Sequence, residues 1–257
     1  MNQVFSFKRF GMLLRKLTVE NFRGYLMSLV VVMGIMAIVM GIIHYNTRSP
    51  MGEGVQMVLF VLFLYLAGTI FTSNVFANLG DKKKAIATLM LPCSSFEKFF
   101  VGWLFSYLIF QALYILVFYV ITIASLHMGN WPESQIHVTN VFNNVANDAI
   151  ITFTAYAFLH AVMLFGAVYF KRMHFIKTAF AFFIIGLVIW LVNDQVLQGM
   201  IHHPISGNPP FTGANFKDGA EYQQVDLNRV NWLIALFGLL SVMIWCATYF
   251  RLKEKQV

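Results

Sequence analysis

Six long apolar segments follow one another along the chain, and each is long enough to cross a lipid bilayer as a helix. About 20 residues, at about 1.5 Å of rise per residue, span a hydrocarbon core of about 30 Å. The chain is 59% hydrophobic and 11% charged, which leaves too little polar surface for a soluble domain of this size. The sequence therefore predicts an all-α polytopic membrane protein, one transmembrane domain over residues 1–257, with spans at residues 25–45, 55–76, 99–126, 149–170, 175–196 and 230–250.

Basic residues are concentrated in every second connection between these spans. All but three of the 18 Lys and Arg lie in the N-terminal arm, the second and fourth loops and the tail at 251–257. Positive charge in short loops is retained on the cytoplasmic side, so we expect both termini to be cytoplasmic. This topology signal, with attraction to anionic lipid headgroups, accounts for the net charge of +7 without a nucleic-acid partner.

The N-terminal arm, residues 4–24, is amphipathic. Phe10, Leu13, Leu14 and Leu17 recur at the i, i+3, i+4, i+7 spacing of one helical face. Such a helix is expected to lie in the membrane interface. Two interpretations stay open, a membrane anchor that orients the first span and an elbow helix that braces a transporter.

The second loop has the most patterned sequence in the chain. It predicts a separate cytoplasmic helix over residues 81–90, ended by Pro92, which disfavours helix at the residue before it. Ser94 and Glu97 have the spacing of a capping box, so the third span should begin directly after Ser94. The loop is either a capped connection with a snorkelling basic run or a docking helix that transmits force from a cytoplasmic partner.

Polar side chains are scarce inside the predicted spans. His160 is the titratable group nearest to the centre of a span, Gln111 lies comparably deep in the third span, and Asn74 lies near the cytoplasmic end of the second. A lone His among small residues favours an interhelical hydrogen bond over a proton relay. Because no carboxylate lies at that depth, coupling to an ion gradient is poorly supported and any work should draw its energy from elsewhere.

Small residues on two spans favour close helix approach. Gly34, Ala37 and Gly41 lie on the first span, and Ala157 and Ala161 on the fourth. Small side chains let helix backbones come together inside a membrane. The approach can occur within one subunit or across a dimer.

The sequence carries no motif of a catalytic centre. It lacks the His-Glu-x-x-His, Gly-x-Ser-x-Gly and phosphate-binding loop patterns, so we expect no enzyme activity, cofactor or metal in this chain. The loop at residues 197–229 is rich in Gly and Pro and suits an ordered loop with short helical pieces. Its His202 and His203, with nearby acidic residues, make a metal site conceivable, but ordinary loop polarity is favoured.

The basic arm, the six spans and the run Leu89-Met-Leu-Pro92-Cys-Ser94-Ser-Phe-Glu97-Lys-Phe together resemble the membrane subunit of bacterial ABC-2 type transporters. The resemblance covers essentially the whole chain. It implies an elbow helix, six spans in the bacterial inner membrane, and short re-entrant helices between the fifth and sixth spans. It also implies two such permease subunits, alike or different, and two separate cytoplasmic ATPase chains that bind ATP and Mg.

By position, the resemblance makes residues 81–90 a coupling helix that docks into the ATPase. The residues it implies in coupling are Lys82, Lys83, Lys84, Ala85, Ile86, Leu89, Met90, Leu91, Pro92, Ser94 and Glu97. The chain is then expected to be the permease half of an ATP-driven exporter. Two other hypotheses stay open. One is a membrane scaffold that binds a partner without transport, and the other is a secondary carrier that depends on His160. The substrate is not given by the sequence.

Overall fold

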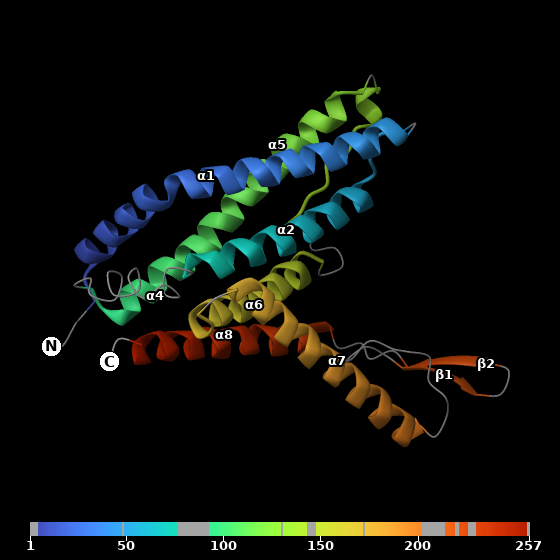
Figure 1. The fold of residues 1–257 in the computed structure, drawn as a ribbon. Helices are drawn as coiled ribbons and strands as arrows, with labels where there is room; N and C mark the ends of the chain where they lie inside the picture. Colours follow the sequence, from blue (N-terminus) through green and yellow to red (C-terminus); the bar gives the residue numbers. More distant parts are fainter. Residues whose placement is uncertain are drawn as a thin grey trace.

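The computed structural model describes residues 5–47, 49–76, 93–129, 131–142, 148–171, 173–201, 214–218, 221–225 and 230–255. Within this part the regular structure is helical except for one hairpin, and short irregular segments connect the helices (Figure 1). The elements are α1 (Phe7–Asn46), α2 (Glu53–Val75), α4 (Ser95–Trp103), the π-helix η2 (Leu104–Ile109), α5 (Phe110–His127), the 3-10 helix η3 (Glu133–Gln135), α6 (Asp148–Tyr169), α7 (His174–Ile201), β1 (Ala214–Asp218), β2 (Glu221–Val225) and α8 (Val230–Glu254).

Among the described residues, six helical stretches are long and apolar enough to cross a membrane. They are Phe22–Asn46, Glu53–Val75, Ser95–His127, Ala149–Tyr169, His174–Val196 and Trp232–Glu254. The predicted number and order of the spans are therefore confirmed, and the chain has the helices of a multi-pass membrane protein. Both termini lie at the same end of the bundle (Figure 1), which we call the terminal end.

The first helix joins two elements that the sequence analysis separated. Residues 7–46 form one α-helix of 40 residues, whereas an elbow helix at 4–24 and a distinct span at 25–45 were expected. The junction has no Pro, and a single Gly such as Gly24 costs a helix only about 1 kcal/mol relative to Ala. Packing of both halves of α1 against the same bundle outweighs that cost.

The connection between α7 and α8 also differs from expectation. Helix α7 extends to Ile201, five residues beyond the predicted end at Val196. Strands β1 and β2 pair antiparallel with Ala214 opposite Val225, where short helical pieces were expected. The sequence places Gly219 and one further residue between the strands, which is the short connection that a two-residue hairpin requires.

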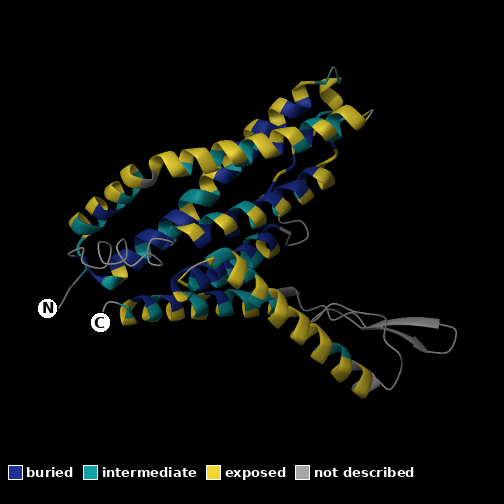
Figure 2. Cartoon of the chain, viewed as in Figure 1, coloured by how far each residue is buried: buried dark blue, intermediate teal, exposed yellow. Residues whose placement is uncertain are grey.

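The described core lies mainly between α1, α2, α5 and α6. Phe60 and Phe118 are fully buried and meet edge to face, with ring centroids 5.0 Å apart. The hydroxyl of Tyr114 donates to the Phe60 carbonyl oxygen over 2.8 Å, which ties α5 to α2. Helix α6 packs against α2, α7 and α8, whereas α7 is exposed along most of its length (Figure 2).

Three helical glycines mark places where helices touch, one of them Gly166 of α6, where a Cβ would clash with Thr178 of α7. A Cβ at Gly68 of α2 would lie 2.5 Å from the Tyr156 ring, and one at Gly102 of α4 would lie 2.4 Å from the Phe76 ring. By contrast, a Cβ at Gly34 or Gly41 of α1 would meet nothing within 4 Å. Small residues therefore permit close approach within the chain at α2, α4 and α6, but not at these two glycines of the first span.

Replacing Gly68 by Leu should destabilise the bundle, because the side chain would displace the buried Tyr156 ring. Overpacking of this kind costs about 1–3 kcal/mol. Gly34→Leu is the matched control, because that position faces open space and Leu favours helix more than Gly does. Thermal unfolding in detergent should show a lower midpoint for Gly68→Leu only. Equal midpoints for the two variants would contradict the close packing of α2 on α6.

Candidate functional site

The start of the third span is fixed by the predicted capping box. The backbone N–H of Glu97 donates to Ser94 Oγ over 3.1 Å, and the backbone N–H of Ser94 donates to Glu97 Oε2 over 2.8 Å. Helix α4 begins at Ser95 as the spacing predicted. The box satisfies two backbone donors that a helix start would otherwise leave free.

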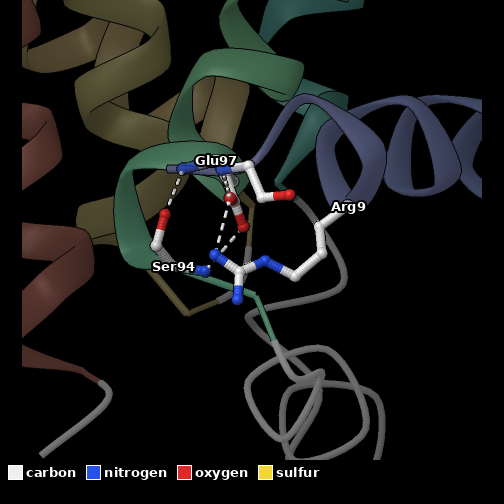
Figure 3. Close-up of polar contacts among 4 residues, drawn as sticks. Arg9, Ser94 and Glu97 are labelled. Atoms are coloured by element: carbon white, nitrogen blue, oxygen red, sulfur yellow. Dashed lines mark hydrogen bonds and ion pairs between the residues drawn. The ribbon is translucent and has the colours of Figure 1, made fainter. Parts of the chain in front are cut away.

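The Glu97 carboxylate also binds the start of α1, which the sequence analysis did not foresee. Its Oε1 accepts from the backbone N–H of Ser6, the N-cap residue of α1, over 2.8 Å, and from Arg9 Nη2 over 3.2 Å. Figure 3 shows Arg9 and Ser94 converging on Glu97. One carboxylate thus accepts the N-cap N–H groups of two helices, whose positive dipole ends it offsets. We call Ser6, Arg9, Ser94 and Glu97 the Glu97 cluster.

Burial makes these bonds necessary. Glu97 is 0% exposed and Ser94 is also buried, while the Arg9 side chain is 35% exposed. A carboxylate taken out of water is costly unless hydrogen-bond donors surround it. The donors on Glu97 come from residues up to 91 positions away in the sequence, so no local motif could have revealed them.

An apolar layer extends the contact between α1 and α4. Leu13 is buried with Cys93, Val101 and Phe105, and the other residues of the predicted apolar arm face, Phe10, Leu14 and Leu17, pack against this group. The apolar face was predicted, but it packs on the third span. Together with the Glu97 cluster, it joins the first turns of α1 firmly to α4.

The described residues that flank the predicted coupling segment lie at this same place. Lys82, Lys83, Lys84, Ala85, Ile86, Leu89, Met90, Leu91 and Pro92 lie outside the described residues. The described residues on each side are both buried, Phe76 at the end of α2 and Cys93 before α4. Phe76 packs in one cluster with Phe99 of α4, so the two flanks of residues 77–92 are anchored to the same helix.

A chain of buried hydrogen bonds crosses three helices around His160, which is fully buried. Trp245 Nε1–H of α8 donates to His160 Nδ1 over 3.1 Å, and His160 Nε2 lies 2.8 Å from Ser106 Oγ in η2. Because the indole can only donate, Nδ1 must accept, and the neutral ring carries its proton on Nε2 toward Ser106. The Ser106 hydroxyl in turn donates to the Gly102 carbonyl oxygen over 2.8 Å.

The other two predicted intramembrane polar residues do not join this chain. Asn74 Nδ2 donates to the Ile70 carbonyl oxygen of its own helix over 3.0 Å and is exposed. Gln111 is partly buried, and its side chain makes no hydrogen bond within the described part of the chain. Of the three, only His160 links separate helices, as predicted for an interhelical bond.

A fourth polar residue, Gln56, was missed. It is fully buried, donates from Nε2 to the carbonyl oxygens of Met51 and His137 over 2.7 and 2.8 Å, and accepts from the Thr139 N–H over 2.9 Å. These bonds tie the loop before α6 to the start of α2. Its position near the end of a span gave no sequence signal that separates it from a solvated Gln.

The described residues include no cluster of three or more His, Cys, Asp or Glu side chains that could hold a metal ion. His202 and His203 lie outside that part, so the conceivable metal site in their loop stays a prediction.

Another titratable group with a shifted pKa is Lys255 at the terminal end. Its Nζ donates to the Val168 carbonyl oxygen, and burial, with the neighbouring charges of Arg251 and Lys171, lowers its pKa.

Comparison with known proteins gives no relative. No family model, curated protein or solved structure matches this chain. Any functional statement therefore rests on the chain's own residues and on the resemblance described above.

Glu97→Ala should lower the stability of the protein by about 3 kcal/mol. The change removes a buried acceptor of three donors and leaves Arg9 without its carboxylate. Glu20→Ala is the control, because its pair with Lys16 on α1 is exposed and such pairs contribute about 0–1 kcal/mol. The free energies of unfolding in detergent should differ accordingly. A Glu97→Ala variant as stable as Glu20→Ala would show that the cluster does not hold α1 to α4.

Cys93 should react slowly with iodoacetamide. Burial raises the pKa of its thiol, an effect that the nearby cations Lys98, Arg9 and Lys16 partly offset. The thiolate is the reactive form, so the alkylation rate should rise with pH later than it does for a free cysteine, whose pKa is about 8.5. The rate is measured against pH in Cys246→Ser, which leaves Cys93 as the sole cysteine. A profile that coincides with that of a short cysteine peptide would contradict this burial.

Proposed function

We propose that this chain is the membrane-spanning permease subunit of an ATP-driven transporter of the ABC-2 type, acting as an exporter in the bacterial inner membrane. The terminal end then faces the cytoplasm, in agreement with the distribution of Lys and Arg. The observation that carries the proposal is the Glu97 cluster, which joins the starts of α1 and α4 beside residues 77–92. ATP and Mg bind in a separate ATPase, two copies of which serve two permease subunits.

The arrangement suits the transmission of force. A push on residues 77–92 reaches α2 through the buried Phe76 and α4 through Cys93 and Ser94. Because Glu97 binds Ser6 and Arg9, movement of α4 carries the first turns of α1 with it. ATP-driven closure of the partner would therefore tilt whole spans. A loop attached to the bundle by flexible ends would only bend.

The basic run at residues 82–84 fits a partner with acidic residues, and it equally fits the headgroups of anionic lipids. Under this proposal the run faces the ATPase, and Ala85, Ile86, Leu89 and Met90 supply the apolar side of the docking helix. Pro92 then sets the angle between that helix and the third span.

The environment of His160 favours an energy source outside this chain. Both ring nitrogens are engaged, one by Trp245 and the other by Ser106. A protonated ring would place an N–H against the Trp245 N–H, so the observed bonds favour a permanently neutral side chain. This supports ATP hydrolysis in a partner over a proton-coupled carrier.

Replacing residues 85–90 by a Gly-Ser linker of equal length should abolish copurification of an ATPase while leaving membrane insertion intact. The experiment isolates the tagged chain from its native host, with and without trapped ATP, and identifies what it retains. The control replaces residues 133–138, in the loop before α6, in the same way.

Retention of the ATPase by the 85–90 variant would refute the docking assignment. Recovery of the unaltered chain without any ATPase would move the assignment to a scaffold or a carrier. A scaffold that does bind an ATPase would show identical spin-label distances in the apo and ATP-trapped complexes. Loss of transport in His160→Ala without any need for ATP would instead establish a carrier.

A further inference from the structure

A groove runs between α6 and α8, apart from the Glu97 cluster. Its volume is about 470 Å³, within the range of about 300–1,000 Å³ that is typical of small-molecule sites. Ile150, Phe153 and Thr154 of α6 line it, together with Gly238 of α8. A Cβ at Gly238 would meet nothing within 4 Å, so the groove is open in front of this residue.

The wall of the groove includes two aromatic side chains that are held in place from behind. Trp245 is fixed by its hydrogen bond to His160, and Tyr107 is stacked on Tyr156 at an interplanar angle of 9°. The Tyr107 and Trp245 rings meet nearly edge to face, with centroids 5.3 Å apart. The groove is therefore preformed, which lowers the entropy cost of binding a ligand.

Two hydroxyl groups of the lining form no hydrogen bond with the described part of the chain, those of Tyr107 and Thr154. Two other hydroxyls, both on α8, bond to carbonyl oxygens of their own helix. Ser241, in the same groove, donates to the Phe237 carbonyl oxygen over 2.6 Å, and Thr248 donates to that of Ile244 over 2.7 Å. A hydroxyl without a partner in a bilayer is costly, so these two groups, which have no acceptor among the described residues, suit a ligand with a hydrogen-bond acceptor.

We propose that this groove binds one phospholipid, with an acyl chain along the α6–α8 seam and an ester carbonyl accepting from Thr154. Both lining spans lie within the membrane-spanning stretches, so the bilayer is the source of the occupant. Thr154 lies about 7.5 Å along the helix from Ala149, where the span begins, which places it near the polar boundary of the bilayer. The inference does not depend on the transporter proposal, because the bound lipid need not be the cargo.

The test uses the full chain in phosphatidylcholine vesicles with a trace of phosphatidylethanolamine that carries a diazirine in one acyl chain. After illumination, the labelled peptides are identified by mass spectrometry. We expect stronger label on α6 and α8 than on α7. Gly238→Leu, which fills the groove, should reduce this label about tenfold, equivalent to about 1.4 kcal/mol of binding free energy.

Gly186→Leu on α7 is the matched control, because a side chain there also meets nothing within 4 Å and the position is exposed. It should leave the label on α6 and α8 unchanged. Thr154→Val keeps the shape of the side chain and should reduce the label about threefold, as expected for one lost hydrogen bond. This variant keeps the test decisive if Gly238→Leu fails to fold.

Three results would overturn the proposal. They are label in Gly238→Leu equal to that in the unaltered protein, label in Thr154→Val equal to that in the unaltered protein, and label as strong on α7 around Gly186 as in the groove. Each would mean that the acyl chain samples the general lipid-facing surface.

Discussion

The arrangement at the terminal end depends on one buried carboxylate. Glu97 accepts the N-cap N–H groups of both α1 and α4, together with the Arg9 guanidinium. A carboxylate removed from water must find such donors, and only a fixed approach of the two helix starts supplies them. The requirement therefore sets where α1 begins and how it lies against the third span, next to Cys93, the first described residue after residues 77–92.

The interior of the bundle uses a second, neutral polar system. This system is a chain of three hydrogen bonds, from Trp245 to His160, from His160 to Ser106 and from Ser106 to the Gly102 carbonyl oxygen. Each polar hydrogen in it has an acceptor. The system passes through η2, where the backbone widens from α-helix to π-helix. Such segments are frequent at functional sites, and here the segment also presents Tyr107 to the groove between α6 and α8. Polar satisfaction within the membrane thus shapes a surface that faces lipid.

The two polar systems connect different helices. The Glu97 cluster joins α1 to α4 at the terminal end, and the His160 chain joins η2, α6 and α8 within the membrane. Helix α7 takes part in neither and is exposed along most of its length (Figure 2). In the proposed transporter, motion received beside residues 77–92 would pass first to the rigidly connected helices, and α7 would follow through its contacts with α6 and α2.

The sequence by itself determined the class of the protein, its six spans and the capping box at Ser94, because each follows from local features: length and hydropathy for a helix in lipid, and the Ser-x-x-Glu spacing for the cap. It also indicated that His160 would serve an interhelical bond. Only the tertiary structure decided that α1 is continuous through residue 24, that Glu97 binds Ser6 and Arg9, and that Gln56 is buried. These outcomes depend on contacts between residues that are far apart in the chain. Helix propensity and hydropathy belong to the local sequence, whereas the desolvation of a polar group depends on the neighbours that the folded chain brings around it.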